Sequence, residues 1–416
     1  MIFLDIGYFI LLALSIPLWI HFLILKRYRQ LFKHRFSPAM EPGIKESLWI
    51  HAVSVGEVRS LENLISRLSI THKNIILSVT TPSGYDYARK TLTGIRVINS
   101  PLDFSFVIKK FLKILNPHLL ILNELEIWPN WLSIMEKNRI PVVVINGRIS
   151  ESAYRKYKKC RWLFKKYFNM VDFYFLQSEV HRERFKTFYL PESKLKVCGN
   201  IKADEAFALK KSLPSKIEIL NHLKLSSPRK KIIVLASTHA ADEKIIFPAL
   251  PALTDKYALI IVPRHPHRTA QIEKQLEKLG LAHATWSRSS RINPDESVFI
   301  FDRIGYLFPI LAISDLVFMG GTFQKKIGGH NLYEPAIHGK IILGGPRFNN
   351  FPDIGAELVK KGVYRIIRNG PDFKATIQEL EGLDLEKMGQ QALNTVLDQK
   401  GSTKCILNQL QSFIRD

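Results

Sequence analysis

A glutamate that follows a short apolar run is the first residue of this sequence suited to acid–base chemistry. The run Leu48–Val53 is followed by Ser54, Val55, Gly56 and Glu57, and then by an amphipathic stretch. This order predicts a strand, a tight connection and a helix, with Glu57 in the first helical turn. A carboxylate at that place could act as a general base, while Gly56 allows a close approach. An acid in the first turn could also serve only to stabilise the helix dipole.

Two more carboxylates and an arginine follow other apolar runs. Glu124 and Glu126 come directly after the run Leu119–Asn123. Both could face a substrate, or one could be an ordinary solvent-exposed acid. Arg148 follows the next run, where it could bind an anion or pair with a carboxylate.

Residues suited to holding a phosphate follow the apolar runs of the second half. Ser237 and Thr238 come after one run, where hydroxyls could donate to a phosphate or cap the next helix. Pro263, Arg264 and His265 come after the next run. An arginine in that place suits bidentate binding of a phosphate or carboxylate.

A dense string of Gly, His, Asn, Glu and Pro occupies residues 328–335. Its paired glycines, which include Gly329, would let backbone N–H groups approach an anion. Glu334, early in the following helix, could accept hydrogen bonds from a ribose diol. A Gly-Gly pair on its own would indicate only a turn.

Several common nucleotide and metal motifs are absent. The sequence has no G-x-x-x-x-G-K-[ST] loop, no G-x-G-x-x-G, no Asp-x-Asp and no His-Glu-x-x-His. These absences argue against a P-loop nucleotidase and a typical dinucleotide binder. We expect no metal and no cofactor.

Apolar runs alternate with amphipathic stretches along most of the chain. The runs predicted as strands are Leu48–Val53, Ile75–Thr80, Arg96–Asn99, Leu119–Asn123, Val142–Asn146, Phe173–Gln177, Ile232–Ala236, Leu259–Val262, Val298–Phe301, Leu316–Met319 and Ile341–Leu343. Such alternation predicts an α/β fold with parallel sheets, and a pause over residues 206–230 divides it in two. Two doubly wound, Rossmann-like domains should then face a cleft that binds ligands outside the carboxyl ends of the strands.

The N-terminus predicts a membrane anchor. Residues 6–25 are apolar apart from Ser15, Pro17 and His21, and as a helix they would span about 30 Å. The lysines and arginines that follow, up to Arg35, predict that both domains lie on the cytoplasmic side with the N-terminus opposite. A helix that only lies in the membrane interface is the alternative.

These patterns give expected boundaries. Residues 1–35 form the anchor and its basic flank, 36–205 the first domain, 206–230 a linker, and 231–416 the second domain with C-terminal helices.

Charge and cysteine content constrain the partners and the compartment. The 416 residues contain 60 Lys and Arg against 37 Asp and Glu, a net charge of +23. Such a chain should be attracted to nucleic acid, anionic lipid or acidic substrates. Cys160, Cys198 and Cys405 have no partner at metal-ligand spacing and form no disulfide framework. We expect three unpaired structural cysteines and a reducing compartment.

Eight segments, in this order, resemble the Kdo (3-deoxy-D-manno-octulosonic acid) transferases. They are WIHAVSVGE (49–57), NELEIWPN (123–130), INGRIS (145–150), QSE (177–179), GNIKAD (199–204), ASTH (236–239), IIVPRHPHR (260–268) and GGHNLYEPAIHGKIILGGPRFNNF (328–351). The resemblance implies the two-domain glycosyltransferase fold called GT-B. It also implies inverting transfer of Kdo from CMP-Kdo to a lipid A precursor (lipid IVA) in lipopolysaccharide synthesis, at the cytoplasmic face of the bacterial inner membrane.

The resemblance also implies roles for single residues. Glu57 corresponds to the general base, and Glu124 to a second carboxylate on the acceptor side. The donor nucleotide would be bound by Pro263, Arg264, Asn331, Leu332, Tyr333 and Glu334. Further contacts to phosphate or substrate would come from Ser54, Gly56, Arg148, Lys202, Ser237, Thr238, His265, Gly329 and His330.

One family segment departs from its usual form in this chain. The segment that usually reads Met-Gly-Glu corresponds to Ile304, Gly305 and Tyr306, so that Tyr306 replaces an acid. Gly305 is therefore the strongest nucleotide contact among the three. The position of Ala240 likewise lacks an acid that is often present in the family.

Two other functions compete with this one. The chain could be a GT-B transferase that uses another donor, such as a UDP-hexose, on another membrane acceptor. It could also be a basic, membrane-tethered nucleic-acid-binding protein. Against the latter, the sequence has no recognition-helix or RNP motif.

Overall fold

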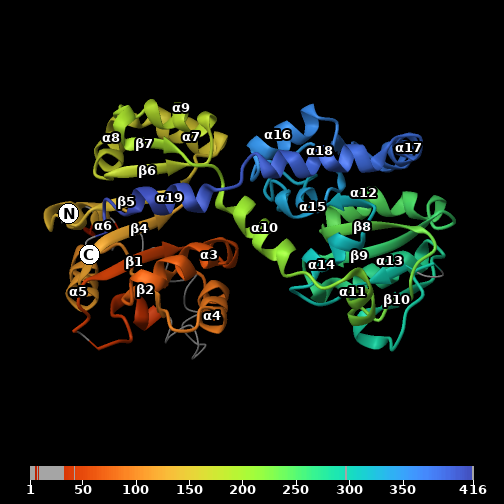
Figure 1. Cartoon of the computed structure of the whole chain (residues 1–416), viewed down its shortest axis with the longest axis horizontal. Coiled ribbons are helices and arrows are strands. Elements are labelled where there is room, and N and C mark those ends of the chain that lie inside the picture. The colour runs from red at the N-terminus through yellow and green to blue at the C-terminus, as the bar shows by residue number, and fades with distance from the viewer. Residues whose placement is uncertain (1–4, 7, 9–31, 42, 296–297, 415–416) are drawn as a thin grey trace. The chain divides into compact units, whose positions relative to one another are not determined.

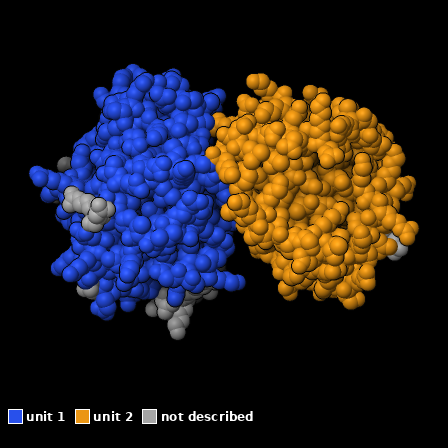
Figure 2. Space-filling view, in the orientation of Figure 1, with its two compact units in different colours: residues 1–205, 401–416 blue, residues 206–400 orange. Residues whose placement is uncertain are grey.

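The computed structural model describes residues 5, 6, 8, 32–41, 43–295 and 298–414. The chain forms two compact units (Figure 2). Unit 1 comprises residues 1–205 and 401–416, and unit 2 comprises residues 206–400.

Unit 1 is built on a parallel seven-stranded sheet in the order β3-β2-β1-β4-β5-β6-β7 (Figure 1). Its strands are β1 (Ser47–Ala52), β2 (Ile75–Val79), β3 (Arg96–Asn99), β4 (Pro117–Asn123), β5 (Val142–Gly147), β6 (Phe173–Leu176) and β7 (Leu195–Val197). Every residue of β1, β2 and β5 is buried, as expected for parallel strands with helices on both faces.

Helices cover both faces of this sheet. They are α3 (Val55–Thr71), α4 (Pro82–Thr91), α5 (Ser105–Leu115), α6 (Pro129–Lys137), α7 (Glu151–Lys159), α8 (Arg161–Asn169), α9 (Glu179–Lys186), the 3-10 helix η1 (Glu192–Lys194) and α19 (Ser402–Leu410), while α10 (Ile201–Lys211) continues into unit 2. Two apolar cores result. One packs Leu61 and Leu64 of α3 on one face of the sheet. The other is rich in aromatic residues and holds Trp49 beside Trp131, with ring centroids 4.7 Å apart.

Unit 2 repeats the architecture, with a parallel sheet in the order β10-β11-β9-β8-β12-β13-β14. Its strands are β8 (Lys231–Thr238), β9 (Tyr257–Pro263), β10 (His283–Thr285), β11 (Val298–Ile300), β12 (Leu316–Met319), β13 (Ile341–Gly344) and β14 (Tyr364–Ile366). Its helices are α11 (Lys216–His222), α12 (Ala240–Ile246), η2 (Phe247–Ala252), η3 (Pro266–Arg268), α13 (Thr269–Lys278), η4 (Trp286–Arg288), α14 (Leu307–Ile313), α15 (Tyr333–Ile337), α16 (Pro352–Lys360), α17 (Gly370–Glu381) and α18 (Leu385–Leu397).

The prediction of two parallel, doubly wound sheets is confirmed. Each predicted strand is present, with ends that differ from the prediction by only a few residues. Strands β7, β10 and β14 were not predicted, because each has only three residues and at least one of them is polar, whereas the equally short β11 lies in a continuous apolar run.

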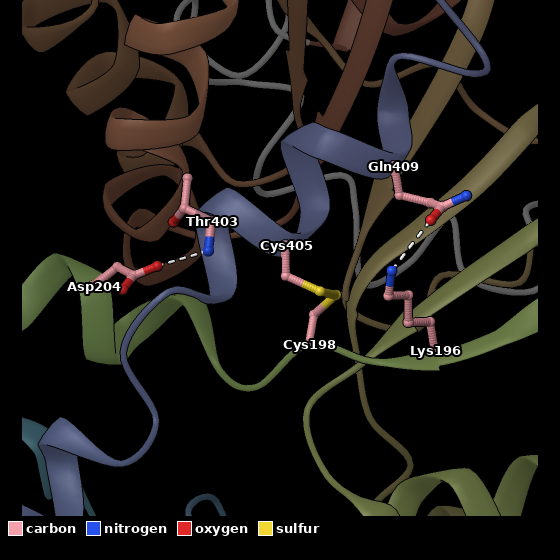
Figure 3. The surroundings of a disulfide bond; sticks show 6 residues. All are labelled: Lys196, Cys198, Asp204, Thr403, Cys405 and Gln409. Carbon is pink, nitrogen blue, oxygen red and sulfur yellow. Dashed lines mark hydrogen bonds between the residues drawn. A yellow bond between two sulfur atoms is a disulfide. The ribbon is translucent and has the colours of Figure 1, made fainter.

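The predicted boundaries need two corrections. Much of the segment 206–230, expected to be a linker, is helical and belongs to unit 2. Residues 401–416, assigned to the second domain, belong to unit 1, because Ile406 and Leu410 of α19 are buried in the same core as α3. Asp204 fixes the start of α19 by accepting hydrogen bonds from the backbone N–H groups of Gly401 (2.8 Å) and Thr403 (2.6 Å) (Figure 3).

The expectation of three unpaired cysteines was wrong. Cys198, which follows β7, forms a disulfide with Cys405 of α19 (Figure 3), and only Cys160 is free and exposed. The pair is 207 positions apart in the sequence, so only the return of α19 to unit 1 brings the two sulfurs together. Disulfides are typical of oxidising compartments, so the cysteines no longer favour a reducing one.

Most of the predicted anchor, residues 6–25, lies outside the described residues. Within the part of the chain that the structure describes, no helix is long and apolar enough to cross a bilayer. The described N-terminal residues rest on unit 1: Asp5 accepts a hydrogen bond from the backbone N–H of Ser105 (2.8 Å), and the rings of Tyr8 and Phe36 both pack against Phe104. These contacts place Asp5 on unit 1 itself.

The disulfide gives a prediction about stability. Cys405→Ser is expected to lower the free energy of unfolding by about 2–5 kcal/mol, because the bond closes a very long loop. Urea unfolding with and without dithiothreitol measures this change, and reductant should bring the unmodified protein to the same level. Cys160→Ser is the matched control. Three free thiols in the unfolded, unreduced protein would contradict the bond.

Candidate active site

The two strand orders each contain one point at which the winding of the sheet reverses. In unit 1 this point lies between β1 and β4, and in unit 2 between β8 and β12. Connections leave the sheet in opposite directions there, which opens a crevice at the carboxyl ends of the strands. The predicted residues Glu57 and Glu124 follow β1 and β4, and Ser237 lies at the end of β8. The sheet orders therefore bring the main predicted site residues of each unit to its crevice.

Glu57 is held by hydrogen bonds at the start of α3. Its Oε2 accepts from the backbone N–H of Val53 (3.0 Å) and from Asn123 Nδ2 at the end of β4 (3.3 Å). Its Oε1 accepts from Ser54 Oγ (3.3 Å). Burial, followed by the negative charge of Glu124, raises the pKa of Glu57 to about 7. A carboxylate with this pKa is basic enough to take a proton near neutral pH.

Gly56 leaves open space beside Glu57. A Cβ built on Gly56 would have no atom of the protein within 4 Å, and the backbone there does not require glycine. No packing contact within unit 1 therefore explains the glycine.

Glu124 is a buried anion paired with two cations. Its Oε2 accepts from Arg148 Nε at 2.8 Å, and its Oε1 lies 3.8 Å from Lys202 Nζ. Burial alone would raise the pKa of Glu124, but Arg148 and Lys202 outweigh burial and lower it, which keeps the group ionised. Its backbone is left-handed, with φ +60°, and its N–H donates to Ile145 of β5 (2.9 Å). A non-glycine residue in this conformation is strained, and such residues cluster at functional sites.

Glu126 is a second weak acid near the crevice. Trp128 Nε1 donates to its Oε2 at 2.8 Å. Burial raises the pKa of Glu126 to about 7, with a further contribution from the charge of Glu124. The sequence left open whether Glu124 and Glu126 form a functional pair. The structure separates them into one ionised carboxylate and one with a raised pKa.

The carboxyl end of β8 makes the crevice of unit 2. Ser237 has a left-handed backbone with φ +52° and lies against Gly320, the residue after β12. A Cβ on Gly320 would come within 2.3 Å of the Ser237 carbonyl oxygen, so only glycine fits there. Close packing of these two connections shapes the crevice.

Three histidines meet at this crevice. Nε2 of His239 and Nε2 of His330 are 2.8 Å apart, and their rings stack. The ring of His265 lies 5.5 Å from that of His239. Burial and neighbouring cationic groups lower the pKa of His239 to about 4 and that of His330 to about 3. Two neutral rings at pH 7 can share one hydrogen bond between them and still offer one N–H donor to a ligand.

Arg264 and Gly329 complete the group. The backbone N–H of Arg264 donates to the Thr238 carbonyl (3.0 Å), and its side chain is exposed. Gly329 has φ +83°, and its N–H donates to Gly321 (3.0 Å). An exposed guanidinium beside histidines suits an anionic ligand. Among the described residues, no three His, Cys, Asp or Glu side chains are arranged to hold a metal ion.

Comparison with known proteins identifies the family. Residues 26–205 match the family model described as 3-deoxy-D-manno-octulosonic-acid transferase (kdotransferase). The chain is 32% identical over 326 residues to the 3-deoxy-D-manno-octulosonic acid transferase of Chlamydia pneumoniae, covering 77% of this chain and 74% of that protein. The chain belongs to the Kdo transferase family. It is therefore a glycosyltransferase.

Two other similarities extend the comparison. A bifunctional glycosyltransferase/methyltransferase of Fusobacterium nucleatum is 33% identical over 362 residues, which cover 85% of this chain, and the chain spans about half (55%) of that relative's length. The structure of UDP-GlcNAc 2-epimerase from Neisseria meningitidis matches 89% of this chain and 100% of that one, with a TM-score of 0.63 at 14% identity. At this identity the likeness shows the fold alone, which is of the GT-B type.

In the Kdo transferase segment Asn331–Glu334, Asn331 is half-buried and the other three residues are buried. Asn331 Nδ2 donates to Glu334 Oε1 (3.3 Å). Leu332 and Tyr333 are buried, and the Tyr333 hydroxyl donates to Gln399 Oε1 (2.5 Å). Their positions indicate that Leu332 and Tyr333 pack the core, while Asn331 and Glu334 are the polar pair of the segment.

The segment Ile304–Tyr306 has a different environment. Ile304 is exposed, Gly305 has φ +100°, and the ring of Tyr306 stacks on His222 of α11. The contacts found for Tyr306 are therefore with His222, Trp286 and Phe301 rather than with the three histidines at the crevice of unit 2.

A buried network behind the histidines was not predicted from the sequence. Glu243 is fully buried, accepts from Thr238 Oγ1 (3.0 Å) and forms two hydrogen bonds with Arg268 (2.8 and 2.6 Å). Asp242 accepts from the N–H groups of His239 (2.9 Å) and Gly321 (2.7 Å). The capping-box spacing from His239 to Asp242 was a signal that could have revealed part of it.

The two glycines give a matched prediction. Gly320→Ala should destabilise the protein by about 1–3 kcal/mol, because its Cβ would overlap the Ser237 carbonyl. Gly56→Ala, with open space at its Cβ, should change stability by less than about 0.5 kcal/mol. Thermal and urea unfolding of both variants measure this contrast, and equal stability of the two would contradict the close packing.

Proposed function

We propose that this chain transfers Kdo from CMP-Kdo to a lipid A precursor, lipid IVA, in lipopolysaccharide synthesis. The observation that carries the proposal is Glu57: a carboxylate with a pKa of about 7 at the crevice of unit 1, beside the open space at Gly56. Membership of the Kdo transferase family supports the sugar that is transferred.

In the proposed reaction, Glu57 is the general base of a single displacement. A hydroxyl of the acceptor attacks the anomeric carbon of Kdo while Glu57 takes the hydroxyl proton. The bond from the anomeric carbon to the phosphate oxygen breaks, its electron pair leaves with CMP, and the anomeric configuration inverts.

Glu124 acts in this scheme through its charge. Because Arg148 and Lys202 keep it ionised, it raises the proton affinity of Glu57 without competing for the proton. Ser54 orients the carboxylate of Glu57 through its hydrogen bond.

The donor would bind at the crevice of unit 2. Arg264 would meet the charge of the phosphate as CMP leaves, at the end of the crevice that Ser237 and Gly329 line. His265 and His330 would donate neutral hydrogen bonds, and the pair Asn331 and Glu334 would contact the ribose. No metal and no cofactor take part in the scheme.

We also propose that the protein works at the cytoplasmic face of an anionic bacterial inner membrane. The apolar run 6–25, its basic flank and the net charge of +23 support this location, because the acceptor is a phosphorylated lipid.

Removing the base is the direct test of the proposal. Glu57→Gln should lower kcat by about 10²–10⁴-fold while the protein stays folded. Product mass spectrometry after mixing enzyme, CMP-Kdo and lipid IVA measures transfer, with Glu136→Gln, an exposed acid on α6, as the control. Near-normal turnover by Glu57→Gln would rule out this base.

Inhibition by nucleotides tests the donor. CMP should inhibit the transfer and UDP should not, and the reverse result would point to a different donor.

The pH profile tests the electrostatic role of Glu124. Since burial and then the charge of Glu124 raise the pKa of Glu57 to about 7, kcat/KM should fall as the pH drops below about 7 and the base becomes protonated. Glu124→Gln removes the negative neighbour, so the acid limb should move to lower pH. Rates of Kdo transfer between pH 5 and pH 9 measure the shift. An acid limb that stays in place would contradict the coupling.

A further inference from the structure

A basic and apolar surface on α7 and α8 has no part in the site described above. Seven lysines and arginines lie between positions 155 and 166, with no Asp or Glu from 152 to 171. Trp162 is 77% exposed and Leu163 45% exposed at the start of α8. No residue of α7 is buried, and Phe168 is the one buried residue of α8. The three helices α7, α8 and α9 lie together at one end of unit 1 (Figure 1).

Packing within unit 1 does not explain Trp162 and Leu163. The inner side of α8 is supplied by Phe164, Tyr167 and Phe168, which join the aromatic core, while Trp162 and Leu163 do not. Large apolar side chains exposed side by side indicate a surface that meets a partner.

The lysines and arginines around Trp162 and Leu163 are mostly not paired with a carboxylate in the contacts found for them. Arg155 pairs with Glu151 at 2.9 Å. Arg161 and Lys165 lie over the exposed ring of Tyr189, at 5.4 and 4.6 Å from its centroid. These contacts hold the cations beside aromatic rings without neutralising them, so the surface presents a strong positive field.

A lipid bilayer fits this combination better than another macromolecule. Tryptophan and leucine that project between lysines and arginines are typical of helices that lie in a membrane interface. Tyr8 of the N-terminal apolar run packs on the same part of unit 1 as α8. Tyr8 and Tyr167 of α8 pack against the same aromatic core. Phe36, which follows the run, packs on the same Phe104 ring as Tyr8.

We infer that the surface formed by α7 and α8 docks on an anionic lipid bilayer, with Trp162 and Leu163 inserted between lipids and the lysines against headgroup phosphates. The inference deepens the proposed membrane location and names the surface that meets the membrane. Arg148, the partner of Glu124, lies three residues before α7. Docking at α7 would therefore bring the acceptor-side crevice close to the layer that holds a lipid acceptor.

The free cysteine between the two helices allows a direct test on the full chain. Cys160 is exposed and free, while Cys198 and Cys405 are joined, so a polarity-sensitive fluorophore can be attached to Cys160 alone. Vesicles of phosphatidylcholine with 30% phosphatidylglycerol should increase its emission at least about twofold, and spin-labelled lipids should quench it. The control is Cys160→Ser with the label on Lys278→Cys, an exposed position of α13. A Cys160 label that stays in water while the protein sediments with vesicles would overturn the inference.

Charge removal at the surface is the second measurement. Lys156, Lys159 and Lys166 changed together to Gln should raise the lipid concentration at half-maximal response about 100-fold, since each lysine near an anionic surface contributes about fivefold. The matched control changes Lys244, Lys274 and Lys278, which are exposed on unit 2, to Gln and should leave the response in place. Equal effects of the two triple variants, or a Cys160 label that responds to oligonucleotides and not to vesicles, would overturn the inference.

Kdo transfer to a detergent-dispersed acceptor separates this inference from the proposed function. Lys156, Lys159 and Lys166 changed to Gln should keep that transfer while losing the vesicle response. If the unmodified chain transfers no Kdo but its Cys160 label enters anionic vesicles, the proposed reaction fails and the docking surface stands.

Discussion

The geometry of a parallel sheet is the constraint on which the rest of this structure depends. Because all strands run the same way, every strand delivers its following loop to one edge of the sheet, and the reversal of winding opens that edge. In unit 1 the reversal lies between the strands that precede Glu57 and Glu124. In unit 2 it lies between the strands that precede His239 and Gly320. Residues that are far apart in the sequence thus become neighbours without long connecting loops.

The chemistry at the first crevice follows from burial beside a fixed charge. A single carboxylate in this place would become a weak acid through desolvation alone. The structure adds a second carboxylate, Glu124, and keeps it ionised with Arg148 and Lys202, so that its charge adds to the proton affinity of Glu57. The strained backbone of Glu124 is stabilised by its hydrogen bond to β5 and by these two ion pairs. Burial of Glu57 and the neighbouring charge of Glu124 therefore act together to raise the pKa of Glu57.

The two units are joined by two stretches of chain, at residues 205–206 and at residues 400–401. Both stretches are fixed on unit 1 at nearly the same place. Asp204 lies at the first of them and binds the backbone just after the second, and the Cys198–Cys405 bond closes the arrangement. The last helix thus ties the C-terminus to the unit in which the chain began, and it fills part of the core under α3.

The sequence by itself determined the architecture and most of the chemistry-bearing positions. Apolar runs alternate with amphipathic stretches along the chain, and buried parallel strands require such runs. The two sheets and the loops after β1, β4 and β8 could therefore be found from the sequence. Segments that resemble the Kdo transferases added the proposed role of Glu57 as general base. Tertiary structure alone decided which side chains form ion pairs, hydrogen bonds and the disulfide. The pairing of Glu124 with Arg148 and Lys202, the network of Glu243 and Arg268, and the disulfide at Cys405 join residues from 24 to 207 positions apart. Short-range periodicity carries no information over such separations, because these contacts depend on how the sheets wind and where the last helix returns.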